Sequence, residues 1–561
     1  MTAMNYFERH RERFEQAVAA CEDRSSWSAF APTPAQYPNS ESAQAAGKAA
    51  FEDWLGREVS LEQPGEQGLI GEEVSPYTRK PLDISYRQAD PDALFEAAKQ
   101  AIGGWQGVSS QARIGVLMEV TDRLYQRIFE LAHATMHTSG QSFNMGYAGS
   151  GTNALDNGIE ALVYAHRAMA QVPDEAEWQR DFGKTRVQLQ KSYRIVPKGV
   201  AVCFACATFP AWNAYPAMMA SLATGNAVIV KPHPTCVLPM AISVAVFREV
   251  LAEAGFDPNL VTMALDTQAE PIGKTLVKHP DTAIVDFTGS SRFGAWVEAN
   301  ATPAECFTET AGVNTVVLES CEDLDAVARS LATTLCLFSA QMCTSPQNIY
   351  MPRDGVIEAG RRVPADEVVQ RLSRAVEQLG ADPEKASKIM ATIQSQGSIE
   401  LLDQLSAAVD DSARVALPWG SYSHPEYPDA RTATPLLLEV TPEHRDMYLE
   451  ERFAPVGFLI QCVDADEALR QATTDVRAAG GLTAFVYSTD EQFLEAAEHL
   501  YAQAGAQLTC NVTGPMPLNF SAAYSDYHIT GLNSAGNGTL TDLAFVASRF
   551  SIAQSRRPVV A

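Results

Sequence analysis

In the middle of the chain, strand-like apolar segments alternate with helical ones. Residues 200–204 (Val-Ala-Val-Cys-Phe) and 227–230 (Ala-Val-Ile-Val) are continuously apolar, and a helical pattern near 216–222 separates them. The alternation repeats with a helical pattern over 239–254 and an apolar stretch over 260–265. Such a rhythm predicts a parallel sheet covered by helices on both faces. The expected fold class is α/β, with a Rossmann-like unit that binds a ligand beyond the carboxyl ends of its strands.

Length and charge narrow the class of protein. A chain of 561 residues with 46% hydrophobic content predicts two or three domains. Its net charge of −26, from 42 basic and 68 acidic side chains, would repel nucleic acid and anionic membranes. The N-terminus (Met-Thr-Ala-Met-Asn-Tyr-Phe-Glu-Arg) lacks the apolar core of a secretory signal, and no apolar run is long enough to span a bilayer. We expect a cytoplasmic protein.

The ten cysteines do not suggest a disulfide framework in a chain of this length. Cys203 and Cys206 form a C-x-x-C pair, but this pair lies in an apolar, strand-like run without a second pair or neighbouring histidines. We therefore expect buried thiols there and no metal site.

Cys343 and Glu309, 34 residues apart, are a candidate nucleophile and base. A thiol reacts as its thiolate, so an enzyme that uses one supplies a base, and a carboxylate can also activate the water that releases an acyl group. On spacing alone, an inert core thiol and a buried structural glutamate are the alternatives.

Further motifs surround this pair, and together they carry a family resemblance. They are Phe209-Pro-Ala-Trp-Asn213, Gly225-Asn226 before the strand that ends at Lys231, Phe287-Thr-Gly-Ser290 with Gly294, and Glu450-Glu-Arg-Phe-Ala-Pro-Val456. From about residue 70 onward the chain resembles the aldehyde dehydrogenase superfamily. The resemblance implies that Cys343 attacks an aldehyde, that Asn213 and the backbone N–H of Cys343 stabilise the oxyanion, and that Glu309 helps water to cleave the thioester to a free acid. A helix cap is the alternative role for Asn213.

The resemblance also implies a nicotinamide cofactor, although the G-x-G-x-x-G fingerprint is missing. Gly289 and Ser290 would present a helix N-terminus to the pyrophosphate, the alternative being a glycine turn with a serine cap. The other cofactor-contact residues implied are Trp212, Lys231, His233, Gly294, Glu451 and Phe453, with an ordinary solvated pair as the alternative for Glu450 and Glu451. Pro234 stands where the family often has a ribose-binding glutamate, and Lys231 and His233 could pair with a 2′-phosphate. We therefore predict NADP, with NAD as the alternative.

Two C-terminal segments, 524–531 and 534–538, depart from the family pattern and should affect the mouth of the substrate tunnel. With the N-terminal extension, they make the chain resemble the phenylacetic-acid-degradation aldehyde dehydrogenases called PaaN. That resemblance implies a coenzyme A-linked semialdehyde as substrate and a separate hydratase, since no hydratase domain follows. Arg556 and Arg557 are candidate phosphate anchors or part of a solvated tail.

The expected organisation is a helical extension (1–65), a cofactor-binding domain (66–180 and 197–311), a catalytic domain (312–515) and oligomerisation elements (181–196 and 516–561). Helical patterns cover 6–21, 40–55, 90–104 and 110–139, whereas 187–196 and 544–553 alternate like strands and would join subunits into a homodimer or homotetramer. A surface hairpin is the alternative at 187–196. The alternative functions are an aldehyde dehydrogenase of other substrate range, a cysteine-dependent thioester or ester hydrolase, and a catalytically silent binding protein.

Overall fold

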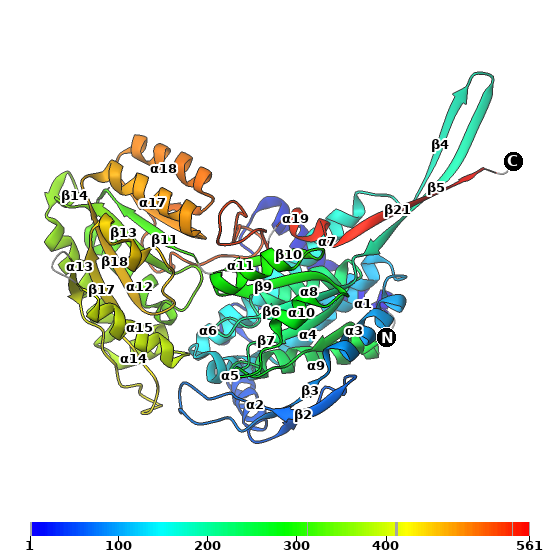
Figure 1. Cartoon of the computed structure of the whole chain (residues 1–561), viewed down its shortest axis with the longest axis horizontal. Helices are drawn as coiled ribbons and strands as arrows, with labels where there is room; N and C mark the ends of the chain where they lie inside the picture. The colour runs from blue at the N-terminus through cyan, green and yellow to red at the C-terminus, as the bar shows by residue number, and fades with distance from the viewer. Residues whose placement is uncertain (1–2, 311, 410–412, 541, 560–561) are drawn as a thin grey trace.

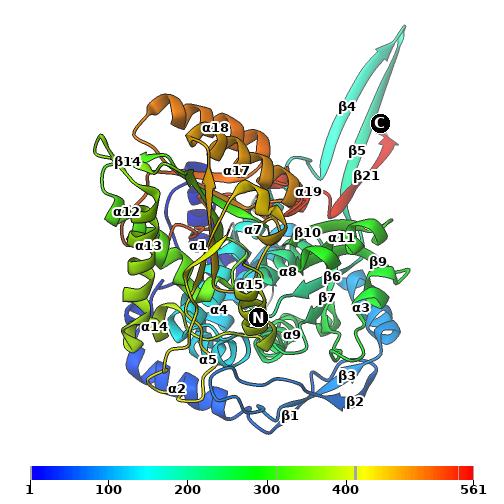
Figure 2. The ribbon, with the colours of Figure 1, turned by 60° about the vertical axis from the view of Figure 1, so that its left-hand side comes forward.

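The computed structural model describes residues 3–310, 312–409, 413–540 and 542–559. Ala311, in the Glu-Thr-Ala-Gly stretch that begins at Glu309, lies outside the described residues. Two lobes and a projecting β arm make up the molecule (Figure 1), and the view turned by 60° in Figure 2 shows the arm standing clear of both lobes.

The first lobe contains the parallel sheet predicted from the alternating pattern. Its strand order is β10-β9-β6-β7-β8, and each neighbouring pair is parallel. All residues of the two central strands β6 and β7 are buried, which explains why their sequences are continuously apolar. The strands are β6 (Val200–Ala205), β7 (Ala227–Pro232), β8 (Val261–Met263), β9 (Thr282–Gly289) and β10 (Glu305–Thr310), and the helices between them are α8 (Ala214–Ala223), α9 (Leu238–Glu253), η3 (Pro258–Leu260), α10 (Gly273–Lys278) and α11 (Ser291–Asn300).

The N-terminal residues complete this lobe. Tyr6, Phe7 and Phe14 of the first helix are buried in the same core as the sheet, so the extension is an integral part of the lobe. The helical stretch predicted over 110–139 is two helices that meet at Arg127. The elements are α1 (Ala3–Asp23), η1 (Pro34–Gln36), α2 (Ser40–Glu52), β1 (Glu58–Val59), β2 (Glu66–Ile70), β3 (Ser85–Ala89), α3 (Pro91–Trp105), α4 (Ser110–Gln126), α5 (Ile128–Ser139), α6 (Phe143–Tyr147), η2 (Ala148–Asn153) and α7 (Ala154–Ala170).

The second lobe is built on a sheet with the strand order β16-β17-β18-β13-β11-β19-β20, in which β16 runs antiparallel to its neighbour. Asp323, Asp464 and Asp490 cap helices α12, α17 and α18 by accepting backbone N–H groups. The sheet strands are β11 (Asn314–Leu318), β13 (Pro346–Pro352), β16 (Arg414–Leu417), β17 (Leu436–Val440), β18 (Val456–Cys462), β19 (Thr483–Tyr487) and β20 (Gln507–Cys510). The other elements are β12 (Ser320–Cys321), α12 (Leu324–Cys336), η4 (Leu337–Ala340), β14 (Val356–Glu358), β15 (Arg361–Val363), α13 (Ala365–Gly380), α14 (Pro383–Ile389), α15 (Gln396–Ala407), η5 (Pro442–His444), α16 (Arg445–Tyr448), α17 (Ala465–Ala479) and α18 (Glu491–Ala504).

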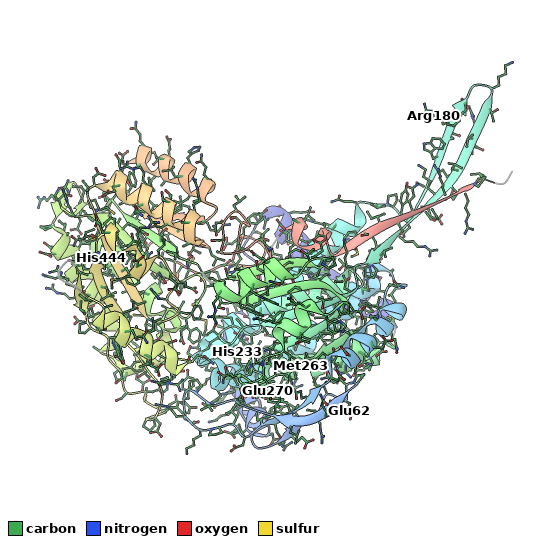
Figure 3. All side chains as sticks on the ribbon, viewed as in Figure 1. Glu62, Arg180, His233, Met263, Glu270 and His444 are labelled. Atoms are coloured by element: carbon green, nitrogen blue, oxygen red, sulfur yellow. The ribbon has the colours of Figure 1, made fainter. Side chains whose placement is uncertain are left out.

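The arm is an antiparallel sheet of order β21-β5-β4, formed by β4 (Glu175–Phe182), β5 (Thr185–Pro197) and β21 (Phe550–Pro558). Figure 3 shows Arg180 on the arm, far from His233 in the body of the molecule. The strand predicted over 544–553 is wrong in its first half, which belongs to α19 (Leu543–Ala547). Asp542 accepts from the backbone N–H of Phe545, and this cap starts a helix where the apolar alternation predicted a strand.

The strands of the two large sheets fall within 197–311 and 312–515, and we keep the expected division of the chain as a proposal. Among the described helices, none is both long and apolar enough to cross a membrane.

Candidate active site

A cavity of about 1000 Å³ is lined by side chains of both lobes. Its first-lobe wall lies where β6, β7 and β9 end, at Ala205, Lys231 and Gly289, and Cys343 and Glu451 line it from the second lobe. A cavity at the carboxyl ends of parallel strands is where α/β sheets bind nucleotides, as the sequence predicted.

Cys343 lies in the turn between η4 and β13. Residues 338–340 just before it have φ between 48° and 54°, a left-handed conformation that surrounding contacts must hold. One such contact is Asn314, whose Nδ2 donates to the carbonyl oxygens of Cys343 (2.7 Å) and Ser345 (3.0 Å). The side chain of Asn314 therefore fixes the turn that carries the thiol.

Three further polar side chains gather beside the thiol. Nε2 of His528 lies 2.9 Å from Oε1 of Glu309 and 3.9 Å from Sγ of Cys343. Asn213 donates from Nδ2 to the other oxygen of Glu309. Burial, with the Glu309 carboxylate as the next cause, raises the pKa of Cys343 well above its usual range. Cys343 and Glu309 are thus brought together as predicted, and the resting thiol is protonated at neutral pH.

Asn213 occupies the position just before α8, where a helix cap was the alternative role. Its side chain makes no capping hydrogen bond within the described part of that helix. The amide instead points to Glu309, and the side chain is only 5% exposed. The position beside the base therefore favours the catalytic role over the cap.

His528 belongs to the 524–538 stretch that departs from the family pattern. Part of this stretch lies against β10, because Asn537 N–H donates to Thr308 O (3.2 Å) and its Oδ1 accepts from Thr308 N–H (2.9 Å). The two backbones are so close that a Cβ on Gly536 would stand 2.6 Å from Thr308 O. The sequence predicted an effect of this stretch at the tunnel mouth, and the structure also brings its imidazole beside Cys343, the predicted nucleophile.

At the other end of the cavity, Nζ of Lys231 forms a buried ion pair with Oδ1 of Asp266, 2.5 Å away. The other Asp266 oxygen accepts from Ile272 N–H at 3.0 Å. Burial, with the neighbouring Lys231 charge as the next cause, lowers the pKa of His233 to about 4, so this imidazole is neutral at pH 7. Pro234 stands where the resembling family often has a glutamate, and Asp266 provides a carboxylate in the same region.

Gly289 and Ser290 line the cavity, and Ser290 also caps α11 by accepting from Phe293 N–H. The serine cap is therefore present, and the contact of this turn with a pyrophosphate stays a prediction. Gly294 is not among the described residues that line the cavity, and its cofactor contact stays a prediction. A Cβ there would stand 2.3 Å from Cγ2 of Thr310, on the strand that carries Glu309.

Trp212 lines the cavity, and its ring packs edge-on against His528 with centroids 4.3 Å apart. This contact places Trp212 on the catalytic side of the cavity, next to the thiol and the base.

Glu451 and Phe453 also line the cavity. Burial raises the pKa of Glu451 well above its usual range, whereas Glu450 is exposed and pairs with Arg452. Gln347 organises this loop, since its Oε1 accepts from Arg452 N–H (2.9 Å) and its Nε2 donates to Glu450 O (3.0 Å). The two glutamates therefore differ, and only Glu451 faces the cavity.

Comparison with known proteins identifies the family to which a chain with this site belongs. The model of the aldehyde dehydrogenase family matches residues 66–522. The chain belongs to the aldehyde dehydrogenase family. A crystal structure of an NAD-dependent aldehyde dehydrogenase from Burkholderia multivorans is 42% identical, with a TM-score of 0.95 and 99% of each chain covered. The 1-pyrroline-5-carboxylate dehydrogenase 2 of Bacillus subtilis is 24% identical over 489 residues, which is 83% of this chain and 87% of that protein.

A structure of 1-pyrroline-5-carboxylate dehydrogenase from Thermus with bound NAD has the same fold, with a TM-score of 0.73 at 19% identity over 93% of this chain and 97% of that one. The protein is thus an NAD(P)-dependent aldehyde dehydrogenase.

Sequence reasoning missed three side chains of this aldehyde dehydrogenase site: Asn314, Asp266 and His528. His528 is one of ten histidines, and the sequence could have singled it out only by its position in the 524–538 stretch, which differs from the family pattern. Within the described residues, Glu309, Cys343 and His528 form the one cluster with metal-ligand spacing.

Proposed function

We propose that this aldehyde dehydrogenase oxidises an aldehyde to a free carboxylic acid, with Cys343 as nucleophile, Glu309 as base and Asn213 as oxyanion donor. The observation that carries the proposal is the contact of Asn213 with Glu309 beside the thiol, at one end of a cavity that continues to Lys231. The thiolate attacks the aldehyde carbon to give a thiohemiacetal. Asn213 has two N–H groups, so it can keep its bond to Glu309 while it donates to the oxyanion.

A nicotinamide cofactor bound beside Cys343 would supply the hydride acceptor that the conversion of the thiohemiacetal to a thioester requires. Water deprotonated by Glu309 then attacks the thioester carbon, the C–S bond breaks, and the acid is released. The predicted product is therefore a free acid.

We infer that NAD is the preferred cofactor. The residues present fit a dinucleotide, because the buried Lys231–Asp266 pair can hold a ribose while Gly289 and Ser290 offer the N-terminus of α11 to the phosphates. The Asp266 carboxylate can accept from a ribose 2′-hydroxyl and would repel a 2′-phosphate. The pKa of about 4 leaves His233 neutral at pH 7, so of the two residues considered for a 2′-phosphate only Lys231 would carry a charge. The NAD-dependent relative at 42% identity supports the same preference.

We propose that the substrate is a semialdehyde with a mainly apolar body. The PaaN resemblance suggests one candidate, the coenzyme A-linked semialdehyde of phenylacetate degradation. Met145, Phe209, Leu337 and Phe520 are among the lining residues. Arg556 and Arg557 lie on strand β21 in the arm and are not among the described residues that line the cavity, which removes them as coenzyme A anchors within one chain. A separate hydratase-type enzyme and a cytoplasmic location remain predictions.

We propose that the arm joins subunits into a homodimer or homotetramer. It is exposed along most of its length, and it presents Phe182 (55% exposed) and Ile552 (46% exposed) to solvent. Exposed apolar side chains on a sheet with a free edge strand favour pairing with a second copy.

The test of function measures reduced nicotinamide with NAD or NADP, using simple aliphatic and aromatic aldehydes, glutamate semialdehyde and a coenzyme A-linked semialdehyde. Wild type is compared with Cys343→Ala, and product analysis distinguishes a free acid from a thioester. We expect cysteine-dependent reduction that favours NAD. Equal rates in Cys343→Ala would remove Cys343 as the nucleophile.

A further inference from the structure

The imidazole of His528 is the group in this site that the family resemblance does not explain. It is 3% exposed and contacts both the proposed base and the proposed nucleophile through a single atom, Nε2. Glu309 and Cys343 are 219 and 185 residues away from it in the chain. The fold nevertheless brings a carboxylate oxygen, the sulfur and an imidazole nitrogen of the three residues within 4.8 Å of one another.

The hydrogen-bond network assigns the proton of His528 to Nε2. Oε1 of Glu309 lies 2.9 Å from Nε2 and accepts from it, whereas Nδ1 is buried and has no hydrogen-bond partner among the described residues. A proton on Nδ1 would be a buried N–H without an acceptor, which costs free energy. The neutral tautomer with Nε2–H avoids that cost and leaves one donor between the carboxylate and the sulfur.

The thiol of Cys343 needs such a donor. Its pKa is raised by burial and by the charge of Glu309, and the ionisable groups Cys206 and Glu451 raise it further. A thiolate in this site therefore requires removal of the negative charge on Glu309 and a hydrogen bond to the sulfur.

We propose that His528 is a further catalytic residue, beside Cys343, Glu309 and Asn213. Its Nε2–H donates to the Glu309 carboxylate while Cys343 is a thiol, and donates to the sulfur once Glu309 has taken the thiol proton. In this step the S–H bond of Cys343 breaks, its electron pair stays on sulfur, and an O–H bond forms on Glu309. His528 keeps its proton throughout and changes only its acceptor. Nε2 is already 3.9 Å from Sγ, so the change needs a small rotation of the ring. The inference rests on the proposed role of Cys343 as nucleophile.

Contacts from distant parts of the chain hold His528 in place. The ring of Trp212 packs edge-on against it, with centroids 4.3 Å apart. Four residues before it, the hydroxyl of Tyr524 donates to Asp156 (3.0 Å) and its carbonyl accepts from Arg24 (3.2 Å). These anchors allow the imidazole to serve two acceptors without leaving the site.

The test measures the rate at which iodoacetamide alkylates Cys343 in the full-length protein without cofactor, as a function of pH, by mass spectrometry of the Cys343 peptide. His528→Phe and His528→Leu remove the donor, and His528→Gln keeps an N–H donor. We expect the inflection of the profile to rise by about one to two pH units in the Phe and Leu variants, as for the loss of a hydrogen bond to a charged group. The Gln variant should shift less.

Two results would overturn the proposal: an unchanged profile in the Phe and Leu variants, or a shift in the Gln variant as large as theirs, which would mean that ring packing and not the N–H sets the thiol pKa. Exposed His499 provides the matched control, and His499→Gln should leave the profile unchanged. NAD binding by each variant confirms that it folds. If one His528 variant does not fold, the alkylation profiles of the other two are compared with wild type. Alkylation needs no aldehyde, so failure to oxidise any substrate would refute the proposed function without changing this result.

Discussion

Gly536→Ala adds one carbon atom where the 524–538 stretch lies against β10, and it tests how this stretch positions the active site. Gly536 lies in an isolated antiparallel bridge with Glu309, the proposed base. The added Cβ would stand 2.0 Å from Cδ1 of Ile529 and 2.6 Å from the backbone oxygen of Thr308. The Ile529 side chain can move its end, but the Thr308 oxygen belongs to strand β10, so the two backbones must separate.

The size of the effect follows from the contacts. An ordinary carbon–oxygen contact is longer than the 2.6 Å to Thr308, so the separation is roughly 0.5–1 Å, and overpacking of this kind costs about 1–3 kcal/mol. The same displacement moves His528 relative to Glu309, and a catalytic group misplaced by about 1 Å can cost about 100-fold in rate. We expect kcat to fall by about 10- to 100-fold and the thermal midpoint to fall by a few degrees.

Steady-state formation of reduced nicotinamide and thermal denaturation of the full chain measure the two effects. Gly538→Ala is the matched control, because its Cβ would meet only side-chain carbons of Phe307, the nearer at 3.1 Å. It should keep kcat within about threefold of wild type. If Gly536→Ala matched wild type in both measurements, the close approach of this stretch to β10 would not be what holds the catalytic groups together.

Four further outcomes are expected. Glu309→Gln should give a single burst of reduced nicotinamide and then slow turnover in rapid mixing, and unchanged steady-state turnover would remove its role as the deacylating base. Asp266→Asn should weaken NAD binding about 10-fold or more and strengthen NADP binding in fluorescence titrations; equal losses for both cofactors would contradict a role in selectivity. Burial raises the pKa of Glu160 to about 8, so between pH 4.5 and 8 the folded chain keeps a proton that the unfolded chain has lost, and stability falls as pH rises through this window. Glu160→Gln should reduce that fall, by several kcal/mol at most, when denaturant unfolding is compared at pH 6 and pH 9. Phe182→Asp combined with Ile552→Asp should lower the mass measured by light scattering toward that of a monomer, and an unchanged mass would exclude the arm as the subunit contact.

The fold was predictable where one physical signal dominated. Strands β6 and β7 are buried on both faces, so residues 200–205 and 227–230 are apolar throughout and differ from surface strands. Lys231, near the end of β7, is the exception and pairs with Asp266. Prediction failed where a local signal competed with a pattern. The pattern over 544–553 predicts a strand, but 544–547 are apolar throughout and the side chain of Asp542 caps a helix there. The break at Arg127 inside 110–139 has no proline or glycine beside it to reveal it.

The sequence singled out those residues of the candidate site whose chemistry is visible in the chain. Cys343, Glu309 and Asn213 stand in motifs with a clear chemical purpose, and the structure brings them together. His528 and Asp266 have no such local context, because their importance comes from partners that only the folded chain supplies. Asp266 places a carboxylate beside Lys231 where Pro234 offers none, and sequence positions adjacent to Lys231 could not reveal this contact.

The N-terminal extension contacts the segment that carries His528, the proposed catalytic imidazole, and these contacts suggest a structural role for the extension. Arg24 donates to the carbonyl of Tyr524, 500 residues away, and its guanidinium lies 4.1 Å from the ring of Tyr527. Trp27 packs on Tyr524, with ring centroids 5.1 Å apart. The stretch that carries His528 has little regular secondary structure of its own, so its conformation depends on such contacts. A family member that places a histidine beside its nucleophile from an irregular segment therefore needs an additional element to hold that segment, and the extension packs where that element is needed.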